Sequence, residues 1–282
     1  MRNIFLKKII KKLLLILLVL NLFLIYLIYK TSENTFNFIL DDIGDAEDTS
    51  LPYICNTTIS NYKIDTNLDF VLNPKDNLCE PSSNKNLLLV SFVIIAPNYF
   101  EKRTLIRNTW GHTKFSQDMK IIFALGKSEN ETINRMIVEE SNRHQDIIQK
   151  NFLDSYYNLT TKIMMSLNWV SKYCPNSKYI LRINDDVIVN THSLLKYLKQ
   201  IDYKKNQIFG VVRRNTPVDR DPESKFYVSS KEYNKAYYAL YPEGSAYVLT
   251  TDLAFTYYNK SVNTYCPPFS VWLEDVFIGY KH

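Results

Sequence analysis

Apolar runs alternate with amphipathic stretches through the middle of this 282-residue chain. Apolar runs predict five strands, at 87–96, 120–126, 146–148, 179–183 and 208–212, and the runs at 87–96, 120–126 and 179–183 are expected to be buried. Apolar residues at helical spacing predict helices near 101–110, 129–143 and 155–173. Because strands and helices alternate, we expect an α/β fold with a largely parallel sheet that helices cover on both faces.

The longest apolar run lies near the N-terminus. Residues 13–29 contain no charge and one polar side chain, Asn21, and five lysines and arginines precede them. With Ile9 and Ile10, the run is long enough to cross a bilayer of roughly 30 Å as a helix. The positive-inside rule then predicts a cytosolic tail at 1–12, a transmembrane signal anchor at 13–29 and a lumenal remainder. The alternative is a buried core helix.

The remainder divides by composition. Residues 30–84 are polar and acidic, with few sustained apolar patterns, which predicts a stem. Residues 85–282 carry the strand and helix pattern, and about 200 residues are ample for one hydrophobic core. We therefore expect one globular domain after the stem.

The formal net charge of +5 owes much to the basic tail, so the lumenal part is nearly neutral. No nucleic-acid partner is implied, and the chain has no G-x-x-x-x-G-K-[ST] phosphate loop. Four Asn-x-Ser/Thr sequons agree with a lumenal location, at Asn56, Asn130, Asn158 and Asn259.

Four cysteines in a lumenal chain can form two disulfides or remain buried thiols. Of the three possible pairings we favour Cys55 with Cys79, because these two are close in sequence, and then Cys174 with Cys266. Their spacing does not match a zinc site.

Two adjacent carboxylates, Asp185 and Asp186, interrupt the apolar run at 179–190. Adjacent carboxylates repel each other unless a cation lies between them and a ligand. Mg²⁺ or Mn²⁺ commonly takes one or two carboxylates plus substrate phosphates, and ligands bind beyond the carboxyl ends of such strands. The pattern predicts a metal site for a nucleotide diphosphate, with a plain turn as the alternative.

Arg103 and Arg107 lie four residues apart, on a helix predicted to follow the first strand. Guanidinium groups form bidentate contacts with phosphates, so the pair is a candidate clamp for a diphosphate or a uridine. An exposed basic face is the alternative.

Five segments that carry such features occur in one order, at 103–111, 146–148 with 152–162, 182–190, 241–249 and 274–279. Together they resemble the β1,3-galactosyltransferase family, which includes β1,3-N-acetylglucosaminyltransferases. The resemblance covers roughly residues 87–280. It implies a type II membrane enzyme of the Golgi with a GT-A fold, a Rossmann-like mixed sheet, that uses a UDP-sugar and Mn²⁺.

The resemblance also implies roles for individual residues. Asp185 and Asp186 bind the metal, with Asp186 favoured as the direct ligand. Arg103 and Arg107 belong to the nucleotide side of the site. Asn184 stands where the family usually has a third Asp. It can accept a hydrogen bond from the ribose but adds no charge, so a lower metal affinity is expected.

A β product from a UDP-α-sugar requires a single displacement, with one general base near the acceptor hydroxyl and a cation at the departing diphosphate. The resemblance selects Asp275, next to Glu274, as that base; the alternative is a helix N-cap. Gly244 lies in a Tyr-Pro-x-Gly segment that suggests a loop close to the sugar. The aromatic residues that could flank the acceptor are Tyr241, Tyr247 and Trp272.

We expect a hexosyltransferase that forms a β1,3 linkage from UDP-galactose, with a glycan of a protein or lipid as acceptor and UDP-N-acetylglucosamine as the alternative donor. A second hypothesis is a non-catalytic relative that binds sugars or escorts another transferase. Asn184 motivates it, as does the end of the chain at His282, because the family normally continues for several tens of residues and supplies a further His.

Overall fold

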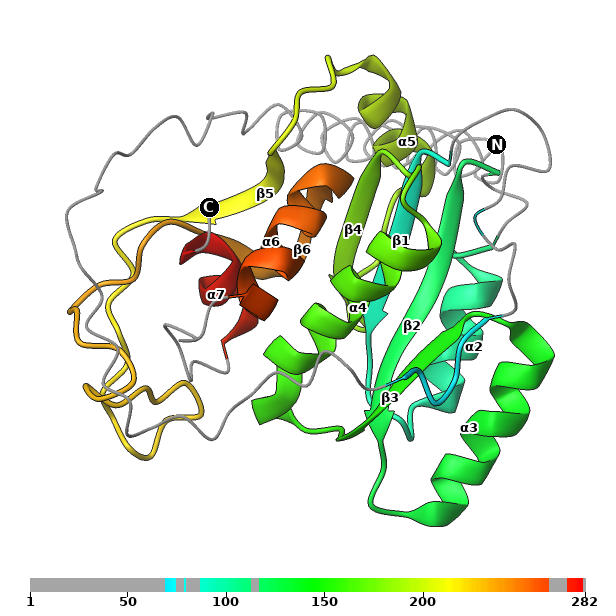
Figure 1. Cartoon of the computed structure of the whole chain (residues 1–282), viewed down its shortest axis with the longest axis horizontal. Coiled ribbons are helices and arrows are strands. Elements are labelled where there is room, and N and C mark those ends of the chain that lie inside the picture. The colour runs from blue at the N-terminus through cyan, green and yellow to red at the C-terminus, as the bar shows by residue number, and fades with distance from the viewer. Residues whose placement is uncertain (1–68, 75–78, 80–86, 113–116, 264–272, 281–282) are drawn as a thin grey trace, which may run out of the picture. The chain divides into compact units, whose positions relative to one another are not determined.

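The computed structural model describes residues 69–74, 79, 87–112, 117–263 and 273–280. Six strands form one sheet in the order β3-β2-β1-β4-β6-β5 (Figure 1). The strands are β1 Leu89–Ile94, β2 Met119–Lys127, β3 Ile147–Leu153, β4 Tyr179–Asn184, β5 Ile208–Arg213 and β6 Tyr241–Thr250. The helices are α2 Phe100–Asn108, α3 Glu131–His144, α4 Leu159–Tyr173 (after the 3-10 turn η2 Tyr156–Asn158), α5 Thr191–Gln200, α6 Thr251–Asn263 and α7 Glu274–Tyr280.

The parallel half of the sheet is confirmed. β1 pairs in parallel with β2 and β4, and β2 pairs in parallel with β3. All six residues of β1 are buried, as expected for a central strand covered on both faces. In the paired register Ile94 lies opposite Asn184, so β1 and β4 end together at one edge of the sheet.

Helices cover both faces of the sheet, as predicted. Val90 and Phe92 of β1 belong to a core cluster with residues of α4, α6 and α7. Leu89 and Val93 belong to a second cluster with residues of α2, α3 and α5. Alternate side chains of a strand point to opposite faces, so the two clusters fill the two sides of the sheet. Figure 1 shows α4 and α2 on opposite sides of β1 and β2.

The other half of the sheet is antiparallel, since β6 lies between β4 and β5 and runs against both. The prediction of a loop around Gly244 is wrong, because Gly244 lies inside β6. The ladder with β4 begins only at Ala246, and Pro242 pairs with Val212 beside a register shift. Proline and glycine are tolerated there because they do not interrupt a central ladder.

A disulfide joins Cys79 to Cys174, with their Cα atoms 5.3 Å apart. Both predicted pairings are wrong, because each contained one of these two cysteines. The bonded pair is separated by 95 residues, so closeness in sequence was the wrong criterion. Cys55 and Cys266 lie outside the described residues.

Part of the predicted stem packs against the globular domain. Leu72 forms an antiparallel bridge with Gln149 of β3. Asn73 Oδ1 accepts a hydrogen bond of 2.6 Å from Trp169 Nε1, and the ring of Phe70 lies edge-on to a ring of α4. Residues 69–74 therefore belong with the sheet domain.

The predicted anchor at 13–29 lies outside the described residues. Among the helices that the structure describes, none has both the length and the apolar character needed to span a bilayer.

Candidate active site

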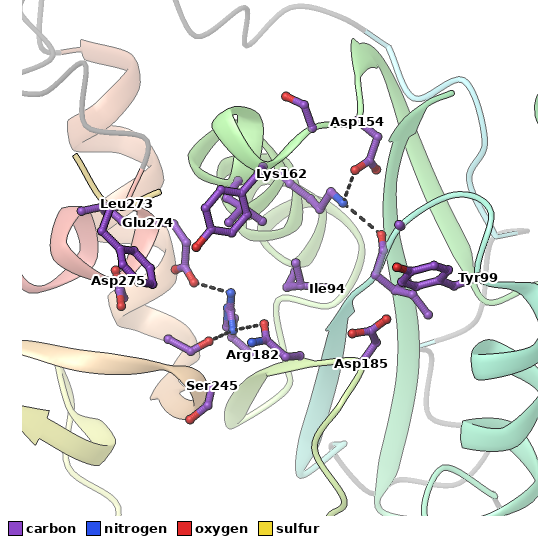
Figure 2. Close-up of a pocket in the computed structure, with 18 residues that line it drawn as sticks. Ile94, Tyr99, Asp154, Lys162, Arg182, Asp185, Ser245, Leu273, Glu274 and Asp275 are labelled. Atoms are coloured by element: carbon purple, nitrogen blue, oxygen red, sulfur yellow. Dashed lines mark hydrogen bonds and ion pairs between the residues drawn. The ribbon is translucent and has the colours of Figure 1, made fainter. Parts of the chain in front are cut away.

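A cavity of about 630 Å³ opens where β1 and β4 end (Figure 2). Its lining comes from the segment after β1, from α4 and the segment before it, from the end of β4, from β6 and from the start of α7. The charged residues that line it are Asp154, Lys162, Arg182, Asp185, Glu274 and Asp275. Ligands of open α/β sheets bind at this edge, so the cavity is the candidate active site.

The two predicted metal ligands follow β4 directly. Asp185 lines the cavity, and its Oδ2 accepts a hydrogen bond of 2.9 Å from Lys102 Nζ. Asp186 is exposed, beside the cavity rather than in its lining. The Lys102 ammonium also lies 4.4 Å from the centre of the Tyr99 ring. A cation thus already rests against Asp185.

Arg182 is a buried residue that lines the cavity and contacts three elements. Its Nη1 donates to Asn184 Oδ1 at 2.7 Å and to the Gly244 carbonyl of β6. Its Nη2 forms an ion pair with Glu274 of α7. Asn184, expected to face the ribose, therefore lines the cavity with its carbonyl oxygen held by an arginine.

Glu274 is buried and takes part in a charge network. Its Oε2 accepts a hydrogen bond of 3.1 Å from the Tyr247 hydroxyl, while its other oxygen faces Arg182. Burial raises the pKa of Glu274 to about 7, although the positive charge of Arg182 opposes that rise. Since both of its oxygens are engaged, Glu274 is less suited than Asp275 to receive a proton from a ligand.

Asp275 lines the cavity from the first turn of α7. Its Oδ1 accepts a hydrogen bond of 2.8 Å from the Val276 N–H. Burial raises its pKa, against the lowering effect of this hydrogen bond and of Arg182. No described lysine or arginine forms an ion pair with Asp275, so its carboxylate is not neutralised by a partner.

Gly244 lies against Asp275, which explains the need for glycine. A Cβ at this position would lie 2.9 Å from Asp275 Oδ2, closer than real Cβ contacts allow. Gly244 also lines the cavity, so this predicted site residue is near the candidate base although it lies in a strand.

Lys162 of α4 is a charged cavity residue that was not among the predicted site residues. Its Nζ donates to Asp154 Oδ1 at 2.8 Å and to the Ile95 carbonyl at 3.0 Å. Burial lowers its pKa, and the charge of Asp154 opposes that change. The available signal was a lysine directly before the apolar run Ile163-Met164-Met165, on the buried face of a helix.

The structure does not bring Arg103 and Arg107 to the cavity. Arg103 is fully buried, with its Nε and Nη2 on Glu140 and further hydrogen bonds to the Ala96 and Pro97 carbonyls. Arg107 binds Glu140 and Asp146. The two guanidinium groups therefore hold α2 against α3 and the start of β3, and neither lines the candidate site.

The aromatic residues around the cavity also differ from those expected. Tyr247 is buried beside Glu274, and Tyr241 is not in the lining. Trp272 lies outside the described residues. The lining instead includes the exposed aromatics Tyr99, Tyr156 and Phe226. Exposed aromatic rings offer apolar faces to a sugar or a base.

The residues present fit a divalent cation only with help from a ligand. Asp185 and Asp186 supply hard oxygen donors, and Asp185 already attracts an ammonium group. Within the described residues no group of three or more His, Cys, Asp or Glu could hold a metal. A two-carboxylate site that is completed by substrate phosphates matches the coordination habit of Mg²⁺ and Mn²⁺.

Fold and site together define an α/β protein with an acidic ligand cavity at the carboxyl edge of its parallel strands. The chain belongs to the galactosyltransferase family, whose model matches residues 101–281. The family resemblance read from the five segments is thereby confirmed.

Individual relatives carry more specific names. Human lactosylceramide 1,3-N-acetyl-beta-D-glucosaminyltransferase is 36% identical over 210 residues, which cover 71% of this chain and 55% of that protein. Form B of the Xenopus laevis enzyme of this name is 30% identical over 263 residues, covering 89% of this chain and 64% of that protein. The chain thus spans about half to two thirds of the length of these curated relatives.

A solved galactosyltransferase in complex with donor and acceptor sugar analogs is 13% identical, with a TM-score of 0.32, over 63% of this chain and 65% of that one. A likeness this low bears on neither fold nor function.

Proposed function

We propose that this protein is an inverting β1,3-glycosyltransferase of the GT-A type that transfers N-acetylglucosamine from its UDP-sugar to a glycan acceptor. The expected donor was UDP-galactose, with UDP-N-acetylglucosamine as the alternative. The relatives named above favour the alternative, because their names specify N-acetylglucosamine transfer.

The observation that carries the proposal is the charge pattern of the cavity. Four carboxylates line it, and two of these form ion pairs with cationic residues of the lining, Asp154 with Lys162 and Glu274 with Arg182. The other two, Asp185 and Asp275, lie on opposite sides of the cavity in Figure 2. In the proposal, Asp185 binds a cation beside the diphosphate, and Asp275 is the proton acceptor.

In the proposed reaction the Asp275 carboxylate accepts the proton of the acceptor hydroxyl as its oxygen attacks the anomeric carbon of the donor. The bond from that carbon to the diphosphate oxygen breaks, UDP leaves with the electron pair, and the configuration inverts. A Mn²⁺ ion held by Asp185 and Asp186 would supply positive charge that stabilises the departing diphosphate.

The cationic residues of the site support an anionic donor. Lys162 and Arg182 line the cavity, and Lys102 donates a hydrogen bond to the lining residue Asp185. A cavity that is lined by both acidic and basic groups suits a metal ion and a phosphate together better than a neutral ligand alone.

The cellular part of the proposal rests on the sequence. We propose a Golgi membrane protein anchored by residues 13–29, with residues 85–282 as the lumenal catalytic domain and glycans of proteins or lipids as acceptors. Nucleic acid is not an expected partner.

The test is UDP release by the purified full-length chain with UDP-N-acetylglucosamine or UDP-galactose, each with Mn²⁺ and with a chelator. We expect metal-dependent release from UDP-N-acetylglucosamine, strong loss of release in Asp186→Ala, and an unchanged unfolding midpoint. Folded wild-type protein that turns over neither donor would contradict the proposal and favour the non-catalytic relative. If neither the chelator nor the Asp186→Ala substitution lowers UDP release, the assignment of a metal site to Asp185 and Asp186 is wrong.

A further inference from the structure

One guanidinium group joins the two sides of the cavity. Arg182 lies on β4, is 4% exposed, and contacts its own strand, β6 and α7 at once. Asn184 stands two residues further along β4 and points to the same face, because strand side chains alternate. The Tyr247 ring flanks the guanidinium, with its centre 5.8 Å from Arg182 Cζ.

These contacts converge on the candidate base without including it. Arg182 donates a hydrogen bond to the carbonyl of Gly244, and Gly244 is so close to Asp275 that a Cβ on it would lie 2.9 Å from Asp275 Oδ2. It also holds Glu274, the residue before Asp275 at the start of α7. The backbone on two sides of Asp275 is thus tied to the strand that carries Asn184 and Asp185.

We propose that Arg182 is a positioning residue that links the donor side of the cavity to the general base. The inference rests on the proposed function, since it assigns a role within that reaction. The guanidinium is one planar group with several donors in fixed directions, so it can hold β4, β6 and α7 in one geometry. Separate hydrogen bonds from different side chains would do so less rigidly.

A purely structural role would be neutralisation of the buried Glu274 charge. The two roles separate in a double variant, because replacing both members of a buried ion pair by neutral groups costs little stability, whereas removing one member costs much. In the double variant Asp275 is still not positioned by Arg182, whereas the destabilisation by an unpaired buried charge at Glu274 is removed.

The experiment compares Arg182→Met, Glu274→Gln and the double variant with wild type, using the full-length chain and the donor that wild type turns over. We expect Arg182→Met to lower kcat about 100-fold, as a displaced reacting group does, and to lower the unfolding midpoint by roughly 10 °C. The double variant should regain most of the midpoint but keep the loss in kcat. The KM for the donor should change less than kcat in both.

Arg213→Met is the matched control, because Arg213 forms an exposed ion pair with Glu243 on the same sheet. It should change neither the midpoint nor kcat. A double variant that regains kcat to within about threefold of wild type, in step with its stability, overturns the positioning role. Wild-type protein without turnover overturns the proposed function, and this inference with it.

Discussion

Arg103 and Arg107 on α2 and Arg182 on β4 all pair with carboxylates, yet the two clusters differ in how completely they are satisfied. In the α2 cluster, two arginines meet Glu140 and Asp146, and the remaining donors of Arg103 reach backbone carbonyls. In the β4 cluster, the Arg182 Nε is buried without a hydrogen-bond partner among the described residues.

The carboxylates of the two clusters differ in the same way. Burial raises the pKa of Glu140, but Arg103 and Arg107 outweigh it, so the net pKa lies below the ordinary value. For Glu274 burial dominates, and the pKa rises to about 7. A saturated cluster stabilises the fold, whereas an incompletely neutralised one beside a cavity is typical of a functional site.

The strongest test of this comparison is Asp275→Asn. An amide cannot accept the acceptor proton, so we expect kcat for sugar transfer to fall about 1000-fold while the protein stays folded. Kinetics and thermal unfolding measure the two effects. Asp118→Asn, which changes a carboxylate outside the cavity lining, is the control and should leave kcat unchanged. Equal activity of the two variants would remove the base assignment.

Glu140→Gln attacks the saturated cluster. It leaves Arg103 buried without its counter-charge, so we expect a loss of about 3 kcal/mol in the free energy of unfolding. The kcat of the folded fraction should remain close to wild type. Denaturant titration measures the first quantity. Lys199→Met, which breaks an exposed ion pair with Asp118, should cost less than about 0.5 kcal/mol. A fall in the kcat of the folded Glu140→Gln protein, without the expected loss in the free energy of unfolding, would show that α2 contributes to function.

The pH dependence of stability should have opposite signs for the two clusters. Glu274 has a raised pKa, so its contribution is present below its ordinary value of 4.5 and is lost as pH rises towards about 7. Glu140 has a lowered pKa, so its contribution is lost only as pH falls below the ordinary carboxyl range. Unfolding free energies of wild type and Glu274→Gln from pH 4 to 8 should show a flatter decline in the variant. Parallel curves would contradict the raised pKa.

The smallest effect is expected at the rim of the cavity. Lys102 is 43% exposed in its ion pair with Asp185, so Lys102→Met should change the free energy of unfolding by less than about 1 kcal/mol. Removing a competing cation should strengthen Mn²⁺ binding by at most about fivefold. Paramagnetic resonance titration of free Mn²⁺ measures it. Weaker binding in the variant would mean that Lys102 does not compete with the metal.

Local pattern was sufficient for much of the fold. The helices predicted near 101–110, 129–143 and 155–173 correspond to α2, α3 and α4, and the five predicted strands are present. Of the predicted site residues that line the cavity, Asp185 was found from its place in an apolar run, whereas Asp275 was selected by the family resemblance. A continuous apolar run, which indicates a strand buried on both faces, and the helical spacing of apolar residues both involve residues that are close in sequence. They can therefore be recognised in one sequence without knowledge of the tertiary structure.

Partner choice was decided by tertiary structure. Arg103 meets Glu140 across 37 residues and Cys79 meets Cys174 across 95. β6 pairs not only with β5, which precedes it in sequence, but also with the more distant β4. No local pattern encodes which of several carboxylates or cysteines will meet a given group. The sequence by itself determined five of the six described strands, the helices α2, α3 and α4, and the chemistry of the candidate residues. Packing decided which arginines are structural and which one lines the cavity, because that depends on long-range contacts.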